Sequence, residues 1–219
     1  MTNDDLLAEM LELDPAAFCD ADKTIRVMSP QIARVNPGKK LLGLARTVRC
    51  YDDFLSIIDA LDQSEPGDVL VIDTQGSTRA VVGELFSLEA SRRGLAGIVI
   101  DGGCRDTETL STLELPVYAT HRTPVSGTVQ KLYATQCEVI CGGVSVSPGE
   151  FIFGDSDGVI VLNQNEASDL LDQAKAIKQV EKQVIDAMAA GKSLIEQTNF
   201  KSHKQAVEAG EESSRLNFE

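Results

Sequence analysis

Residues 83–106 read GELFSLEASRRGLAGIVIDGGCRD. The spacing of their apolar residues predicts a helix over 80–93, a glycine stop and a buried strand over 97–100. The two glycines that follow predict a turn, after which Arg105 and Asp106 open the next element. In α/β proteins, ligands collect at the carboxyl ends of the strands, so these two charged residues are the first candidates for a functional site.

Arg105 and Asp106 suit two complementary tasks. A guanidinium can grip a carboxylate through two parallel hydrogen bonds, and a single carboxylate can anchor a hydrated Mg²⁺. Together they could hold a 2-oxo acid, with the arginine on its carboxylate and the metal on its keto oxygen. A surface ion pair, with Asp106 as a helix N-cap, remains the alternative.

The composition is that of one compact soluble domain with room for a terminal arm. The chain has 219 residues, of which 42% are hydrophobic and 25% charged. Its net charge of −14, from 34 acidic and 20 basic residues, argues against direct nucleic-acid binding, which depends on basic patches. The acidic N-terminus does not resemble a secretory signal, and no apolar run approaches the ~20 residues that cross a membrane. We expect a cytoplasmic protein without a membrane segment.

Five scattered cysteines are expected to be reduced thiols, because their number is odd and a chain of this size does not need disulfides. Cys137 and Cys141 lack the second Cys or His pair of a structural zinc site. The two histidines, His121 and His203, do not belong to the Arg105 constellation, so a His-ligated catalytic zinc is not expected.

The first half of the chain alternates helix and strand signals. Residues 4–13 predict an amphipathic helix, and Asp14 predicts the N-cap of a short second helix. The first convincing strand covers 42–48, and a second covers 69–73. The polar loop 73–77 ends that second strand. If this loop lies beside Arg105 and Asp106, the two form one pocket.

The second half is rich in short strands separated by Gly, Pro and Asp turns. The expected strands lie at 116–120, 137–141, 144–146, 151–153 and 158–162.

A long helix is expected from Asn165 to Ala190, with Asn165 as N-cap and Gly191 as the stop. Glu181 interrupts its apolar stripe, so this carboxylate either faces solvent or reaches across a subunit boundary into a polar pocket. The polar tail 201–219 is expected to follow the surface or to fray.

Four motifs together resemble the RraA-like family, which includes 4-hydroxy-4-methyl-2-oxoglutarate aldolases and regulators of ribonuclease E activity. They are GELF at 83–86, GLAGIVIDGGCRD at 94–106, GGVSVSPGE at 142–150 and GDSDGVIV at 154–161. The similarity covers about residues 41–191. It implies three segments: an N-terminal helical arm over 1–40, a catalytic domain over 41–191 and a C-terminal tail over 192–219.

The resemblance also implies an architecture. It predicts an α/β fold with a layered β/β/α core that resembles a swivelling phosphohistidine-type domain. It further predicts a ring-shaped homotrimer, which could pair into a hexamer, with active sites between subunits.

For the site, the resemblance implies an acidic residue separated from an Arg-Asp pair by twenty intervening residues, as Glu84 is separated from Arg105 and Asp106 here. The aldolases usually have Asp at that first position, so Glu84 is a departure from the pattern. Asp106 would bind Mg²⁺, Mn²⁺ or another divalent cation, largely through waters. A neighbouring subunit would supply one more carboxylate, for which Glu181 is the candidate by position.

The resemblance assigns substrate binding to the same region. Arg105 would bind the substrate carboxylate, and the backbone around Gly83, Leu85 and Phe86 would complete the cradle at a helix start.

Both lines of reasoning favour a metal-dependent aldolase that cleaves small 2-oxo acids to release pyruvate and also decarboxylates oxaloacetate. Glu84 and Glu181 are expected to orient the water that carries the proton. A Schiff-base mechanism is disfavoured, because the lysines fall in predicted turns, surface helices and the tail. The alternative is a non-catalytic protein that regulates an RNA-degrading enzyme through protein contacts. Methyl transfer is the weakest alternative, since the glycine pattern contains no adenosine-binding fingerprint.

Overall fold

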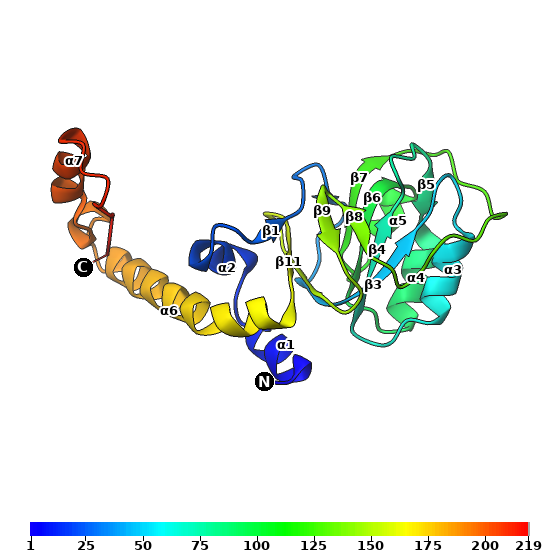
Figure 1. Ribbon diagram of the computed structural model, residues 1–219, viewed down its shortest axis with the longest axis horizontal. Coiled ribbons are helices and arrows are strands. Elements are labelled where there is room, and N and C mark those ends of the chain that lie inside the picture. Colours follow the sequence, from blue (N-terminus) through cyan, green and yellow to red (C-terminus); the bar gives the residue numbers. More distant parts are fainter. Residues whose placement is uncertain (219) are drawn as a thin grey trace. The chain divides into compact units, whose positions relative to one another are not determined.

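A nine-stranded mixed sheet forms the centre of the first of two compact units of the chain (Figure 1). The structure is a computed structural model that describes residues 1–218. The first unit is Met1–Leu171, and the second begins at Asp172. None of the helices in the described part of the chain combines the length and the apolar character needed to cross a bilayer.

Four parallel strands occupy the middle of the sheet. They are β3 (Leu41–Arg49), β4 (Asp68–Asp73), β6 (Gly97–Cys104) and β7 (Val117–Arg122). The short β5 (Ala80–Val82) pairs with β6 in parallel. The remaining strands extend the sheet antiparallel at its two edges: β10 (Phe151–Gly154), β11 (Val159–Leu162) and β1 (Arg26–Val27) beyond β3, and β2 (Ala33–Arg34) beyond β7.

The sheet is buried on both faces, because successive side chains of β4 belong alternately to two different apolar clusters. Leu70 and Ile72 belong to one apolar cluster, which includes residues of the helices α3 (Leu55–Asp62), α4 (Glu84–Arg92) and α5 (Thr107–Leu110). Val69 and Val71 belong to a second cluster with the hairpin of β8 (Val139–Cys141) and β9 (Val144–Val146). Figure 1 shows α3 and α4 on one side of the sheet and this hairpin on the other. The expected α/β fold with β/β/α layers is confirmed.

The decisive stretch 83–106 differs from expectation in two ways. The helix predicted over 80–93 divides into β5 and α4, because Gly83 separates an apolar triplet that pairs with β6 from the amphipathic part. The strand predicted over 97–100 continues to Cys104, so Gly102 and Gly103 lie inside β6 and form no turn. A Cβ at Gly102 would lie 2.4 Å from the Thr74 side chain, so glycine is needed here for a close approach.

The N-terminal forty residues pack against the first unit's core and contribute two edge strands. The expected helices form as α1 (Asn3–Leu11) and α2 (Pro15–Ala21), and Asp14 caps α2 through the Ala17 amide. Leu6 is fully buried, and Phe18 packs edge-on against Phe153 of β10. The sequence predicted only the helical part of this segment, because β1 and β2 are two residues each.

The long helix α6 (Gln164–Ala189) forms close to its expected bounds. Its N-cap is Asn163, and not Asn165, because the Asn163 side chain accepts from the Glu166 amide while Glu166 accepts from the Asn163 amide. Gly191 has a positive φ of 94°, as expected of the stop. Within the second unit, a 3₁₀ turn (Ile195–Gln197) and α7 (Phe200–Glu208) follow, so the tail that was expected to follow the surface or to fray contains a helix.

Candidate functional site

A cavity of about 120 Å³ opens where β5 leads into α4. Its lining comes from β5 and the start of α4, from the residues that follow β6, and from two loop positions. The lining residues are Phe54, Ala80, Val81, Val82, Gly83, Leu85, Phe86, Arg105, Asp106 and Ser126.

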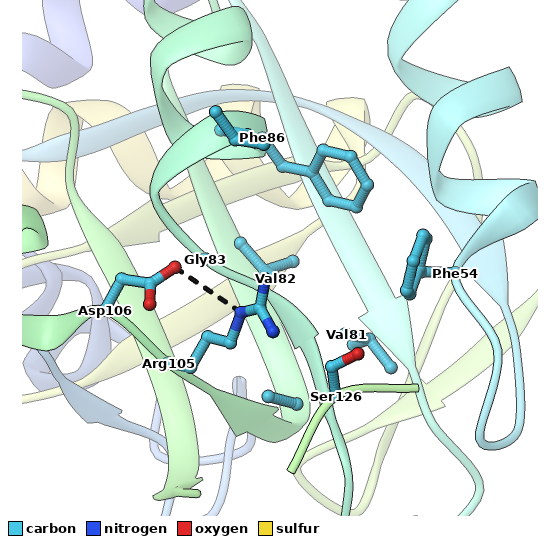
Figure 2. Close-up of a pocket in the computed structure, with 10 residues that line it drawn as sticks. Phe54, Val81, Val82, Gly83, Phe86, Arg105, Asp106 and Ser126 are labelled. Carbon is cyan, nitrogen blue, oxygen red and sulfur yellow. Dashed lines mark ion pairs between the residues drawn. The ribbon is translucent and has the colours of Figure 1, made fainter. Parts of the chain in front are cut away.

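Arg105 and Asp106 face this cavity together. The Nε atom of Arg105 lies 3.5 Å from Oδ2 of Asp106, and the guanidinium points between Asp106 and the apolar side of the cavity (Figure 2). The Arg105 amide donates to the Val82 carbonyl at 3.0 Å, which ties this residue to β5. Both side chains are about 40% exposed, at 43% and 39%, so a solute can reach them.

Asp106 does not use its carboxylate as an ordinary helix cap. It stands at the N-cap position of α5, but its side chain makes no capping bond there. Instead, Oδ2 accepts a hydrogen bond of 3.0 Å from the Glu84 amide, the first residue of α4. The backbone of Asp106 is left-handed, with a φ of 56°, a conformation that Asp tolerates better than most residues. Asp106 therefore occupies the N-cap position and forms the ion pair that the alternative predicted, but its carboxylate does not cap α5.

Gly83 permits this arrangement because it has no side chain. A Cβ at this position would lie 2.4 Å from Oδ2 of Asp106 and 2.9 Å from Cγ of Arg105. The backbone at the start of α4 can therefore approach both charged residues closely.

The opposite wall of the cavity is apolar. Phe54 and Phe86 pack edge to face with ring centroids 5.5 Å apart, beside Val81 and Val82 (Figure 2). Leu85 is 75% exposed and lies at the rim. An apolar wall next to a cation and an anion suits a small, partly apolar organic acid.

Asp53 holds the loop that carries part of the cavity wall. Its buried carboxylate accepts hydrogen bonds from the Leu55 amide, from the Thr128 hydroxyl and from the amides of Gln130 and Lys131. Burial raises the pKa of this carboxyl, but the four hydrogen bonds together lower it by more. The pKa of Asp53 therefore lies below its ordinary value. The carboxylate thus fixes the segments next to Phe54 and Ser126.

Five of the seven predicted site residues line the cavity. They are Gly83, Leu85, Phe86, Arg105 and Asp106. Glu84 supplies its backbone amide to Asp106, but its carboxylate does not line the cavity and makes no hydrogen bond or ion pair within residues 1–218. Glu181 lies on α6 in the second unit, where it accepts a hydrogen bond of 2.7 Å from Lys178.

The loop 73–77 does not line this cavity, so it does not form one pocket with Arg105 and Asp106. Its residues Gly76 and Ser77 line a separate cavity of about 520 Å³ together with His121. The strand β5 follows this loop and pairs with β6. Gly83, directly after β5, therefore lines the cavity beside Arg105, and the loop does not. His121 contacts the Thr78 carbonyl and the Thr120 hydroxyl there, apart from the Arg105 cavity, as the sequence predicted.

A second cavity, of about 370 Å³, adjoins the first and shares Arg105 and Asp106 with it. Arg122, at the end of β7, also lines it, and this residue was not predicted from the sequence. Arg105 was identified because functional residues collect at the carboxyl ends of strands. Arg122 would have been identified in the same way if the strand predicted over 116–120 had been extended by two residues. Cys104 also lines this second cavity, and burial raises the pKa of its thiol, so it is a poor nucleophile.

The residues present fit a hydrated divalent cation better than a protein-enclosed one. Within residues 1–218, no group of three or more His, Cys, Asp or Glu side chains could hold a metal ion. Asp106 offers one exposed carboxylate whose orientation is fixed by the Glu84 amide. Mg²⁺ is commonly bound through one or two carboxylates, with waters and substrate oxygens completing its octahedron.

Comparison with known proteins now assigns the chain to a family. A family model described as RraA-like, aldolase/RraA, matches residues 15–161. The chain belongs to the RraA-like family. The family model matches from residue 15, whereas the similarity of the motifs begins at about residue 41. The matched region therefore includes α2 and the two N-terminal edge strands β1 and β2.

Individual members of the RraA-like family agree with this assignment. A Halalkalibacterium halodurans protein that carries the provisional name 4-hydroxy-4-methyl-2-oxoglutarate aldolase is 31% identical over 173 residues, which are 78% of this chain and 82% of that protein.

Two solved structures extend the likeness to the fold. An uncharacterized Pseudomonas syringae protein has a TM-score of 0.79 at 29% identity, covering 88% of this chain and 96% of that one. A Streptomyces coelicolor protein, described as an unusual member of the RNase ES inhibitor RraA protein family, has a TM-score of 0.73 at 29% identity. That alignment covers 83% of this chain and 96% of the other.

Proposed function

We propose that this RraA-like protein is a divalent-metal-dependent lyase that cleaves small 2-oxo acids and releases pyruvate. Its substrates would be of the 4-hydroxy-4-methyl-2-oxoglutarate type, and it would also decarboxylate oxaloacetate. The observation that carries the proposal is that Arg105 and Asp106 line one cavity, with the Asp106 carboxylate fixed by the Glu84 amide. The provisional aldolase name of the Halalkalibacterium relative supports the same reaction class.

Arg105 and the start of α4 would bind the substrate carboxylate. The guanidinium supplies two parallel donors, and the amides of Leu85 and Phe86 belong to the first helical turn, which has no intrahelical acceptors for them. The positive end of the helix dipole adds to the attraction for an anion. The apolar wall of Val81, Val82 and Phe54 would accept the methyl end of pyruvate.

Asp106 would hold the divalent cation, for which Mg²⁺ or Mn²⁺ fits the oxygen donors. When bound, such a cation acts as a Lewis acid that stabilises negative charge on the keto oxygen. Arg105, which lies 3.5 Å from Asp106, would fix the 2-oxo acid so that its keto oxygen is directed toward the aspartate side of the cavity.

The cleavage conserves atoms and electrons as follows. The C4 hydroxyl loses its proton and becomes a carbonyl, while the C3–C4 bond breaks and its electron pair forms the pyruvate enolate; C3 then takes up a proton. Oxaloacetate loses CO₂ from the same carbon and leaves the same enolate. We assign the orientation of the proton-carrying water to Glu84 and, from a neighbouring subunit of a homotrimer, to Glu181.

The direct test is pyruvate release by the purified chain from 4-hydroxy-4-methyl-2-oxoglutarate and from oxaloacetate, with Mg²⁺ or Mn²⁺ and with chelator. We expect metal-dependent release from at least one substrate and its loss in Arg105→Met. Ser91→Ala, on the exposed face of α4, is the matched control. No metal-dependent release, or an unchanged rate in Arg105→Met, would refute the proposal.

A second candidate follows from the Streptomyces relative, which is described as a member of an RNase inhibitor family. In that case the chain would regulate an RNA-degrading enzyme through protein contacts alone. A calorimetric titration against a ribonuclease E-type scaffold distinguishes the two functions. Binding that persists in Arg105→Met, together with absent turnover, would favour the regulator.

A further inference from the structure

Arg122 ends β7 beside the residue that precedes Arg105. In the parallel pairing of β6 and β7, Arg122 is the register partner of Cys104, and the Thr123 amide donates to the Cys104 carbonyl at 3.0 Å. Paired positions of neighbouring strands share a face of the sheet, so Arg122 lies on the same face as Cys104. The backbone therefore fixes Arg122 next to the Arg105–Asp106 pair.

The Arg122 residue is exposed. Within the described residues its guanidinium makes neither a hydrogen bond nor an ion pair, whereas Arg105 lies against Asp106. An arginine without a carboxylate partner, in a chain with a net charge of −14, is available to an external anion.

Arg122 lines two cavities, and one of them continues from the cavity that would hold the keto acid. Arg105 and Asp106 form part of both walls, and the further cavity, of about 370 Å³, adds the polar residues Thr107 and Thr123. A substrate anchored by its 2-oxo acid group at Arg105 and Asp106 can therefore extend its other end toward Arg122.

The charges around this further cavity favour a dianion. Two guanidinium groups, of Arg105 and Arg122, line it against the single carboxylate of Asp106. A monocarboxylic 2-oxo acid would satisfy Arg105 alone, whereas a dicarboxylic one supplies a carboxylate to each arginine.

We propose that Arg122 binds the distal carboxylate of the substrate and thereby selects dicarboxylic over monocarboxylic 2-oxo acids. This inference rests on the proposed lyase function and names the residue that sets its substrate class. Arg122 touches the end of the substrate away from the bond that breaks, so it would contribute to specificity and leave the chemistry at C3 to Arg105 and Asp106.

The test compares two substrates that differ only at the distal group. They are 4-hydroxy-4-methyl-2-oxoglutarate and 4-hydroxy-4-methyl-2-oxopentanoate, in which a methyl group replaces the distal carboxylate. In Arg122→Met we expect kcat/KM for the dicarboxylic substrate to fall about 10- to 100-fold, mainly through KM, and the value for the monocarboxylic substrate to stay within about twofold. Arg122→Lys should recover part of the loss, because it restores the charge without the planar fork.

Two further measurements separate this inference from the function on which it rests. Metal-dependent exchange of the pyruvate methyl protons with deuterium oxide reports the enolate chemistry alone, and it should be unchanged in Arg122→Met. Arg92→Met, which removes an exposed arginine of α4 that does not line either cavity, is the control for charge. If wild-type protein shows neither exchange nor turnover, the lyase function fails and the inference fails with it. If exchange persists but Arg122→Met slows both substrates equally or neither, only the assignment of Arg122 is overturned.

Discussion

At the scale of single residues, the site depends on one left-handed backbone conformation and on one position that has no space for a side chain. Asp106 has a φ of 56°, and Gly83 leaves no space for a Cβ. Both features serve the same contact, in which the Asp106 carboxylate meets the first amide of α4. Left-handed non-glycine residues concentrate at functional sites, where the surrounding structure holds the strained conformation.

Two substitutions at Asp106 should separate its charge from its backbone. We expect Asp106→Asn to keep the stability of the fold within about 0.5 kcal/mol, because Asn tolerates the left-handed region, while activity falls at least ~100-fold with the lost charge. Asp106→Ala should lose activity equally and also about 1 kcal/mol of stability. Urea denaturation and pyruvate release measure the two effects. Full activity in Asp106→Asn would exclude a role for the charge.

Gly83→Ala should disturb the site while leaving the fold intact. The added methyl group would sit 2.4 Å from the Asp106 carboxylate, which can move because it is partly exposed. We expect kcat/KM to fall about 10- to 100-fold and the melting temperature to change little, because a shift of about 1 Å in a reacting group has effects of this size. The assay is steady-state kinetics beside a thermal melt. A variant with wild-type kinetics would show that the close approach of the Gly83 backbone to Asp106 is not needed for activity.

At the scale of elements, the Asp53 carboxylate joins the start of α3 to the loop 128–131. Asp53→Asn should cost roughly 1–3 kcal/mol at pH 7, since an amide nitrogen would face donors in a buried position. The folded pKa of Asp53 lies below its unfolded value, so its stabilising contribution is present above the unfolded pKa of about 4 and is lost as pH falls through the folded pKa. Urea titrations at several pH values should therefore show the two proteins converging in acid. A gap that stays constant down to pH 2 would contradict this account.

The elements that the sequence predicted well are those with a strong apolar period. The strands β3 and β4 and the helix α6 fall close to their expected bounds, because each presents a long periodic run. The two-residue strands β1 and β2 carry no period that sequence reasoning can detect, and only the register with β11 and β7 defines them. The pair Gly102–Gly103 was read as a turn, but it serves close packing inside β6, and composition cannot tell these two uses apart.

The part of the site that consecutive residues form was predicted from the sequence. The part that the fold brings together from distant segments was not. Arg105 and Asp106 are adjacent in sequence and follow one strand, so their proximity was predictable. The contact of Asp106 with the Glu84 amide spans 22 positions, and Arg122 arrives from a different strand. Phe54 and Ser126 come from loops whose course only the structure provides.

At the scale of the whole molecule, the charge distribution supports a small acidic ligand. The chain carries a net charge of −14, yet the two adjoining cavities are lined by arginines that outnumber their single aspartate. A local cationic site on an acidic protein attracts small anions while the remaining surface repels polyanions such as nucleic acids.

The proposed homotrimer gives a prediction about shared sites. If Glu181 of one subunit serves the site that contains Arg105 of its neighbour, mixed oligomers of Arg105→Met and Glu181→Gln chains should contain complete sites. After denaturation and joint refolding at equal amounts, we expect roughly a quarter of wild-type activity, although each variant alone is nearly inactive. Light scattering should give about three or six times the mass of one chain. A monomeric mass, or an unimpaired Glu181→Gln, would exclude the shared site.

The joint role of Arg105 and a cation at Asp106 is tested by the binding of oxalate, a planar dianion that resembles the enolate of pyruvate. Isothermal titration of the wild-type chain should show binding in the presence of Mg²⁺ and its loss on chelation, because the site needs both Arg105 and a cation at Asp106. Asp106→Asn should abolish the Mg²⁺-dependent binding, and Arg105→Met should weaken it by about 10- to 100-fold. Oxalate binding that is independent of Mg²⁺ and unchanged in Asp106→Asn would contradict a metal site at Asp106.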